Sequence, residues 1–129
     1  AELAIRDGAD SSFYAQFNKI DSIKNVVVVY LNETPVGCGA FKPYDATSIE
    51  VKRMFVSENA RNQKVASQIL TMLENWAKEL GYKRSVLETG KRQPEAIALY
   101  TKAGYQVTAN YGQYIGVDNS VCFEKTIAS

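Results

Sequence analysis

The polar segment Ser57–Gln63 has the composition of an anion-binding turn. It follows a strand-forming stretch and leads into a helix that is predicted to begin at Val65. The first amides of a helix have no partner within it and the helix dipole is positive there, so such a turn can hold a pyrophosphate. Arg61 and Lys64 add positive charge at this point. A plain strand-turn-helix connection with solvated basic residues would show the same pattern, so the residues alone leave both interpretations open.

The sequence contains no histidine, which narrows its chemistry. This absence removes the usual general base near neutral pH, a His-activated nucleophile and most zinc sites. Cys38 and Cys122 are too far apart in the sequence to indicate a metal or redox pair, and each fits a small buried hydrophobe on a strand better than a nucleophile. We therefore expect no metal, and acid-base work must fall to carboxylates, tyrosines or water.

Length and charge favour one globular domain over residues 1–129, because 129 residues suffice for one core. Fifteen Lys and Arg balance fourteen Asp and Glu, which argues against nucleic-acid binding. No apolar run approaches the roughly 20 residues that a membrane span needs, and no signal-peptide core is evident. We expect a cytoplasmic protein with no membrane association.

The longest predicted helix carries a single apolar stripe and stops at Gly81; its apolar positions are Val65, Ile69, Met72, Leu73, Trp76 and Leu80. Ahead of it, the β-branched run Val26–Leu31 predicts a central strand. Val36–Phe41 and Ser48–Val56 continue an antiparallel meander. Within the second of these three strands, Gly37 and Gly39 suggest a bulge or a close backbone approach.

The remaining elements complete a mixed sheet. Ser85–Thr89 should run parallel to Ser48–Val56 through a right-handed crossover. Pro94 suits the first position of a helix over Glu95–Ala103, and strands are expected at Tyr105–Thr108 and Ser120–Thr126. At the N-terminus we expect a strand over Leu3–Arg6 and a short helix capped by Ser11 or Ser12, with Phe13, Phe17 and Ile20 as its apolar stripe. The predicted fold class is α+β, with helices on the faces of a mostly antiparallel sheet.

Two segments together resemble the Gcn5-related N-acetyltransferase (GNAT) superfamily. One is the strand-turn-helix Glu50–Leu73, and the other is Glu95–Tyr105, with its Ala, Leu-Tyr, Lys and Gly-aromatic pattern in the family's order. Leu87–Gly90 and Val121–Lys125 are also similar to a bacterial subgroup of small, mostly uncharacterised members. The similarity extends from Val26 to the C-terminus.

The resemblance implies the acyl-CoA N-acyltransferase fold, with acetyl-CoA as co-substrate and acetyl transfer to the amine of an unidentified acceptor. The co-substrate would lie where the parallel strands Ser48–Val56 and Ser85–Thr89 splay apart. Its pantetheine arm would pair with the backbone of Met54, Phe55 and Val56. Its pyrophosphate would sit on the turn made by Arg61, Asn62, Gln63, Lys64, Val65 and Ala66.

The turn departs from the family pattern, which has Arg or Gln, two residues, Gly, one residue and then Gly or Ala, often with a further Gly after the Arg. Asn62 and Lys64 stand where glycines are usual. Asn tolerates positive φ, so Asn62 is a mild change. The Cβ of Lys64 could hold a phosphate away from the backbone, or its ammonium could compensate. We expect weakened rather than abolished binding.

Two side chains carry catalytic roles by this resemblance. Tyr100 matches a tyrosine that protonates the departing thiolate, although its residue type and spacing also suit a core aromatic. Glu50 precedes Met54–Val56 by the spacing of a general base in histone-type members; a strand-face charge beside Lys52 would look the same. Glu88 is a second candidate, and water chains are another route for the proton.

The acceptor should meet the N-terminal helix, the segment Gly37–Phe41 and the loop Tyr111–Asn119. A small polar amine and a peptide N-terminus are both plausible acceptors, and the protein would act as a monomer or homodimer. The alternatives are a non-catalytic acyl-CoA sensor or interaction module with the same fold, and a peptide-binding domain without co-substrate.

Overall fold

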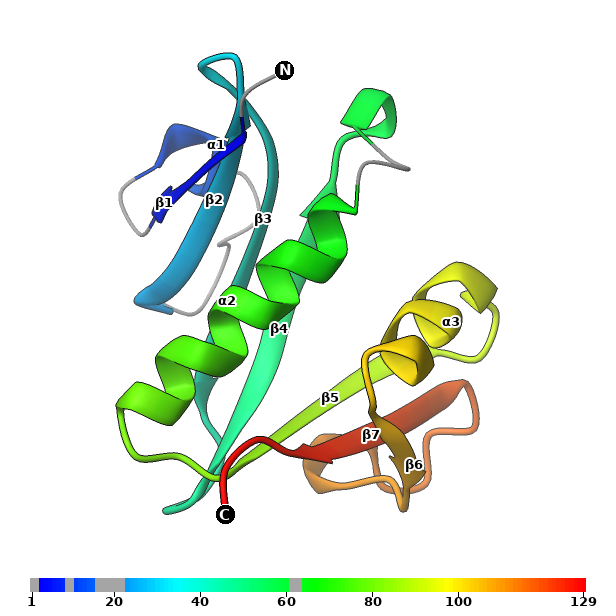
Figure 1. The fold of residues 1–129 in the computed structure, drawn as a ribbon. Coiled ribbons are helices and arrows are strands. Elements are labelled where there is room, and N and C mark those ends of the chain that lie inside the picture. Colours follow the sequence, from blue (N-terminus) through cyan, green and yellow to red (C-terminus); the bar gives the residue numbers. More distant parts are fainter. Residues whose placement is uncertain (1–2, 9–10, 16–22, 61–63) are drawn as a thin grey trace.

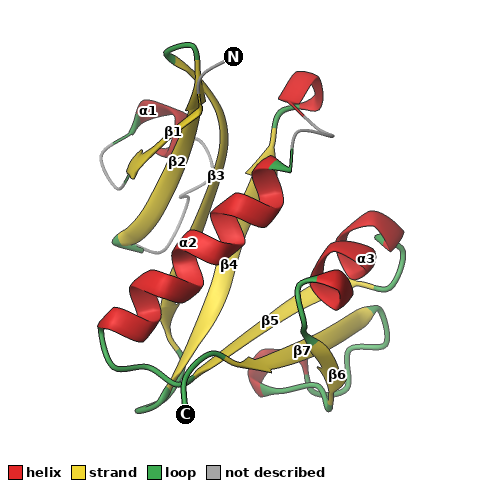
Figure 2. Cartoon of the chain, viewed as in Figure 1, coloured by secondary structure: helices red, strands yellow, loops and turns green. Residues whose placement is uncertain are grey.

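The computed structural model describes residues 3–8, 11–15, 23–60 and 64–129, which form one mixed sheet with helices on its two faces (Figures 1 and 2). The strand order is β1-β2-β3-β4-β5-β7-β6. The strands are β1 Leu3–Asp7, β2 Asn25–Leu31, β3 Thr34–Pro43, β4 Ser48–Val56, β5 Arg84–Gly90, β6 Gln106–Thr108 and β7 Ser120–Thr126. The helices are α1 Ser12–Ala15, α2 Val65–Glu79 and α3 Pro94–Lys102, with 3-10 turns η1 Glu58–Ala60 and η2 Gly112–Tyr114.

The predicted fold class is confirmed. Strands β1 to β4 form an antiparallel meander, β5 joins β4 in parallel after α2, and β7 and β6 add antiparallel strands. At the N-terminus, Ser11 is the capping residue, because its Oγ accepts the amides of Phe13 and Tyr14 at 3.2 and 3.5 Å. The predicted apolar positions Phe17 and Ile20 lie outside the described residues.

Strand β2 is buried on both faces, as its valine run predicts. Val27 and Val29 belong to the core beneath α2, whereas Val26 and Val28 pack on the other face with Tyr14 of α1. Successive side chains of a strand point to opposite faces, so four consecutive valines require a cover on each side. The sheet therefore separates two apolar clusters, and α1 and α2 cover different faces.

Gly39 lets α2 approach the sheet closely. A Cβ at this position would lie 2.5 Å from Cγ2 of Ile69 and 2.7 Å from Sδ of Met54. The predicted bulge is present here too: Cys38 pairs with Phe55 and Ala40 with Lys52, so β4 carries one extra residue opposite Gly39. That distortion places Arg53 at a positive φ of 57°.

Strands β4 and β5 pair over only three residues, which are Ser48 with Arg84, Ile49 with Ser85 and Glu50 with Val86. Beyond Glu50 the two strands move apart, as Figure 1 shows, and β5 continues along β7. The splayed pair implied by the family resemblance is therefore present. Each side of the divergence keeps its own partners, so the opening is built into the sheet.

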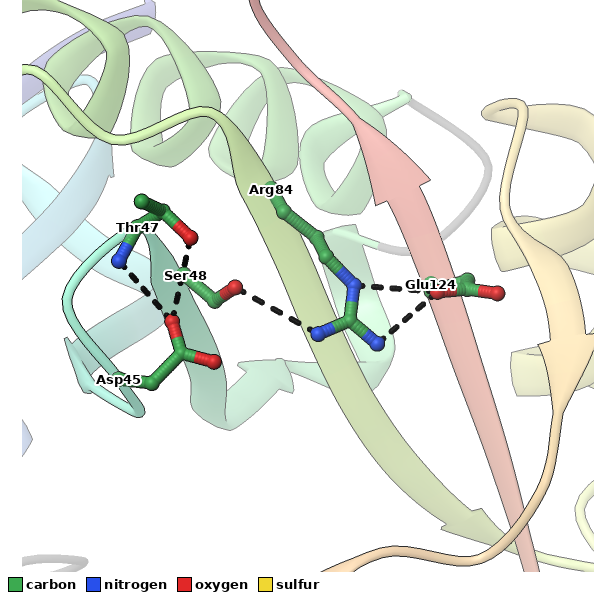
Figure 3. Close-up of polar contacts among 5 residues, drawn as sticks. All are labelled: Asp45, Thr47, Ser48, Arg84 and Glu124. Atoms are coloured by element: carbon green, nitrogen blue, oxygen red, sulfur yellow. Dashed lines mark hydrogen bonds and ion pairs between the residues drawn. The ribbon is translucent and has the colours of Figure 1, made fainter.

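Arg84 ties three strands together at the closed end of this divergence (Figure 3). Its Nε and Nη2 lie 3.0 and 2.9 Å from Oε1 of Glu124 on β7, and its Nη1 donates to Ser48 Oγ on β4 at 3.5 Å. The turn before β4 is closed by Asp45, whose Oδ1 accepts the amide of Thr47 at 3.0 Å. These contacts hold the strands together where their pairing begins.

The close approach at Gly39 generates a stability prediction. Gly39→Ala should lower the free energy of unfolding by about 2 kcal/mol, because the new methyl group overpacks the interface between α2 and β3. The change is measured by urea denaturation of the wild type and the variant.

Gly90→Ala is the matched control, since the closest contact of its Cβ would be the far end of the Asn119 side chain, at 3.3 Å, which can turn away. It should stay within about 0.5 kcal/mol of the wild type. Equal stability of the two variants would contradict the packing assigned to Gly39.

Candidate functional site

The point where β4 and β5 separate is the centre of the candidate site. Backbone N–H and C=O groups along a strand edge can pair with an extended ligand as an added strand would. The edge of β4 that faces β5 is released from strand pairing beyond Glu50. On this stretch, Met54 is half-buried. The other edge of β4 is paired with β3.

Helix α2 begins next to the open end of β4 (Figure 1), and the side chain of its N-cap residue makes no capping hydrogen bond. Lys64 is the N-cap residue, at φ 59° and ψ 24°, and its carbonyl accepts the amide of Gln68 at 3.1 Å. This left-handed conformation is the one that glycine adopts most easily. The Lys64 side chain is exposed, while Val65 is buried and Ala66 is half-buried. The expected pyrophosphate residues Arg61, Asn62 and Gln63 lie outside the described residues.

Tyr100 packs in the core on the α2 face of the sheet, only 7% exposed. Its ring lies 6.0 Å from the rings of Tyr105 and Phe123. Burial raises the pKa of Tyr100 to about 12, so the phenol stays protonated at neutral pH. The structure thus places Tyr100 as a core aromatic with a neutral hydroxyl, and its role as a proton donor stays a prediction.

Glu50 faces the opposite side of the sheet from Tyr100. Its neighbours Ile49 and Val51 join the core beneath α2, so the alternation of the strand turns Glu50 to the other face. Glu50 is 5% exposed, and its Oε2 accepts the hydroxyl of Tyr111 at 2.7 Å. Its Oε1 lies 3.6 Å from Nζ of Lys52. The predicted strand-face pairing with Lys52 is therefore present alongside a contact that the sequence did not indicate.

Lys52 and Tyr114 extend this cluster. Nζ of Lys52 donates to the hydroxyl of Tyr114 at 3.0 Å and lies 5.6 Å from the centre of its ring. Burial by itself would lower the pKa of Lys52, but Tyr114 and Glu50 outweigh it and the pKa is raised. Lys52 therefore remains an ammonium beside the Glu50 carboxylate.

The other candidate groups serve structural roles in this arrangement. Oε2 of Glu88 accepts the hydroxyl of Ser120 at 2.6 Å, which links β5 to the start of β7. Both cysteines are buried, and burial raises the pKa of the Cys38 thiol to about 11 and raises that of Cys122. Neither thiol is a ready nucleophile, because the thiolate form is disfavoured.

One part of the expected acceptor surface is corrected by the structure. All residues of Gly37–Phe41 are buried, because β3 is a central strand with α2 on one face and the Tyr14 cluster on the other. The loop Tyr111–Asn119, by contrast, reaches Glu50 and Lys52 directly through its tyrosines.

The family assignment comes from a sequence comparison. Residues 4–105 match the model of the acetyltransferase (GNAT) family. The chain belongs to this family.

Relatives of the GNAT chain include an IAA acetyltransferase of Azospirillum brasilense, 37% identical over 95 residues, and the N-acetyltransferase YsnE of Bacillus subtilis, 34% identical over 93 residues. The matches cover 73% and 70% of this chain. The chain spans 62% of the length of each of these relatives.

Solved structures share the GNAT fold over nearly the whole chain. A Klebsiella pneumoniae protein assigned to the acyl-CoA N-acyltransferases superposes with a TM-score of 0.85 at 27% identity, covering 97% of both chains. A GNAT acetyltransferase of Elizabethkingia anophelis with acetyl-CoA bound superposes with a TM-score of 0.77 at 21% identity, covering 96% of this chain and 97% of that one. The second likeness concerns the fold alone.

The described ranges of the GNAT chain contain neither a metal-binding cluster nor a membrane-spanning helix. No group of three or more His, Cys, Asp or Glu side chains there is arranged to hold a metal ion. Among the same residues, no helix has the length and apolar character needed to cross a bilayer.

Sequence reasoning missed the contacts of Tyr111 and Tyr114 with β4. The partners are 61 and 62 residues apart, and no spacing rule connects them. The only available signal was the density of tyrosines in a Gly-containing loop between two strands.

Proposed function

We propose that this protein is an acetyl-CoA-dependent N-acetyltransferase that moves an acetyl group to a primary amine by direct attack. The observation that carries the proposal is the divergence of β4 and β5 at Glu50, beside the N-terminus of α2. A slot next to a helix N-terminus suits a long ligand with a polar arm and a diphosphate. Membership of the GNAT family supports the same chemistry.

The backbone of Met54, Phe55 and Val56 would bind the pantetheine arm of acetyl-CoA. The turn Arg61–Ala66 would bind the pyrophosphate. The fit is favoured by the conformation of Lys64, since the backbone adopts a left-handed shape there despite the lysine, and by its side chain, which makes no capping hydrogen bond to the first turn of α2. Acetyl-CoA supplies an activated thioester when it is bound.

Tyr100 and Glu50 would divide the proton transfers between the two faces of the sheet. The neutral amine nitrogen forms a bond to the acetyl carbon as the bond from that carbon to sulfur breaks. Tyr100 donates its phenolic proton to the leaving sulfur and regains a proton from solvent. Glu50 accepts the proton that the incoming ammonium must lose before it can attack. The second nitrogen proton leaves to solvent, so the reaction is balanced without a covalent enzyme intermediate.

The acceptor would approach from the face that carries Glu50 and the tyrosine loop. A primary amine of a small molecule or of a peptide meets this requirement. A ribosomal-protein-S18-alanine N-acetyltransferase of Escherichia coli, whose name indicates a protein acceptor, shares the fold with a TM-score of 0.76 at 14% identity. We propose the broad class of primary amines for this chain, acting in the cytoplasm.

A non-catalytic acyl-CoA sensor is the second candidate, and one observation favours it. Both carboxylate oxygens of Glu50 are already engaged, one by Tyr111 and one by Lys52. A sensor would bind acetyl-CoA in the same slot and transfer nothing. Thiol release with an amine distinguishes the two candidates.

The wild type should bind acetyl-CoA in a calorimetric titration and release free thiol with at least one member of a panel of primary amines and short peptides. Tyr100→Phe should lower kcat by about 10²-fold or more, the range for loss of a general acid, because it removes only the donated proton. The dissociation constant for acetyl-CoA should stay within about twofold of the wild type, since the ring and its packing remain.

Binding without thiol release across the whole panel would reject the enzyme in favour of the sensor. No heat at millimolar acetyl-CoA would reject both. A Tyr100→Phe variant that loses affinity and turnover equally would remove the acid role from Tyr100.

Lys64→Gly should tighten acetyl-CoA binding by about 1 kcal/mol, roughly fivefold in Kd, because the phosphate could then approach the backbone amides of α2 without meeting a Cβ. Lys64→Ala is the matched control, since it keeps the Cβ and removes the ammonium, and it should bind more weakly than the wild type. Calorimetry measures both constants. An unchanged or weaker affinity for Lys64→Gly would show that the Cβ is no obstacle.

A further inference from the structure

Glu50 is nearly buried, and each of its two carboxylate oxygens has a side-chain partner. It is 5% exposed, Tyr111 donates to its Oε2 at 2.7 Å, and Lys52 lies 3.6 Å from its Oε1. A carboxylate can take a proton only from a group within hydrogen-bond reach or through a bridging group. An amine that approached Glu50 directly would have to displace a short hydrogen bond. The group closest to Oε2 of Glu50 among these contacts is the hydroxyl of Tyr111.

Tyr111 is held in place from several sides. Its ring lies 5.0 Å from the ring of Tyr44 and 5.5 Å from that of Tyr114, both edge-on. Nδ2 of Asn110 lies 3.0 to 3.3 Å from three carbonyl oxygens of the loop and of β7, those of Tyr114, Val117 and Ser120. A side chain fixed at both its backbone and its ring presents its hydroxyl in one position. The contact with Glu50 is therefore a defined feature of the fold.

We propose that Tyr111 is the residue that touches the acceptor amine and relays its proton to Glu50. This inference rests on the proposed function and refines it. The ammonium nitrogen gives a proton to the Tyr111 oxygen while the proton of Tyr111 moves to Oε2 of Glu50. An ammonium and a carboxylate become a neutral amine and a carboxylic acid, and Tyr111 ends the step unchanged. Lys52 and Tyr114 are positioning residues, because they act by holding Glu50.

The electrostatics of Tyr111 suit a relay rather than a tyrosinate base. Burial raises the pKa of Tyr111 well above its ordinary range, and the hydrogen bond to Glu50 raises it further. Tyr111 therefore stays a neutral phenol, which has an O–H to donate and a lone pair to accept a proton at the same time.

The test compares Tyr111→Phe, Glu50→Gln and the double variant with the wild type, using acetyl-CoA and the amine that reacts fastest in a panel from ethylamine to phenethylamine. Tyr44→Phe is the matched control, since it deletes a phenol oxygen from the ring beside Tyr111 and keeps the ring packing. Each single change should lower kcat/KM by about 10²-fold, and the double change should cost little more than either one, because the two groups act in one chain. Tyr44→Phe should stay within about threefold.

One further readout separates a relay from a structural role, and a second tests whether the contact itself forms. The solvent deuterium isotope effect on kcat/KM should be larger in the wild type than in Tyr111→Phe, because two protons move in the relay. Urea denaturation of the wild type, the two single variants and the double variant gives the coupling free energy between Tyr111 and Glu50 without ligand. This coupling should be non-zero if their hydrogen bond forms.

The outcomes distinguish failure of the inference from failure of the proposed function. If the wild type is active and Tyr111→Phe has the same kcat/KM as Tyr44→Phe, the relay is overturned and acetyl transfer stands. A non-zero stability coupling would then show that the contact between Tyr111 and Glu50 is purely structural. Faster turnover in Tyr111→Phe would mean that Tyr111 blocks access to Glu50, which would also overturn the relay. A wild type that binds acetyl-CoA but acetylates no amine overturns both.

Discussion

The end of strand pairing at Glu50 is the constraint on which the rest of the structure depends. A sheet of this size could continue its hydrogen bonds along the full length of β4 and β5, but it makes only three parallel pairs. The divergence is fixed because each side is anchored elsewhere. Strand β4 is held by β3 and α2, and β5 is held by β7. Arg84 closes one end, and the ion pair between Glu74 of α2 and Lys125 of β7, at 2.8 Å, links the two sides on the helical face.

The same strand alternation that builds the two cores also separates the two proposed proton transfers. Ile49 and Val51 point into the core beneath α2, so Glu50 points to the opposite face. Tyr100 packs on the α2 face against Phe123. A ligand inserted at the divergence would therefore have a neutral phenol on one side and a carboxylate on the other. The pleat of β4 accounts for this division without any special backbone conformation at Glu50.

Much of the fold was predictable because it depends on local patterns. The valine run of β2, the apolar stripe of α2 and Pro94 at the start of α3 each specify an element through periodicity or backbone chemistry. Gly39 marked the close approach of α2, since only a residue without a Cβ fits there.

The site was less predictable, because its contacts join residues that no local rule relates. The extra residue of the bulge is placed in β4, where Arg53 takes a positive φ that its residue type does not indicate. The position of Tyr111 on Glu50 depends on how the loop after β6 folds back over the sheet. The segment Gly37–Phe41 was expected to meet the acceptor, but its central place in the sheet buries it.

Hydrogen exchange of the backbone amides with and without acetyl-CoA tests the slot most directly. If the pantetheine arm adds to the edge of β4, acetyl-CoA should slow exchange in β4 beyond Glu50 and in the first turn of α2, while the amides of β2 exchange as before. Unchanged exchange in β4 and α2 at millimolar acetyl-CoA would contradict the account.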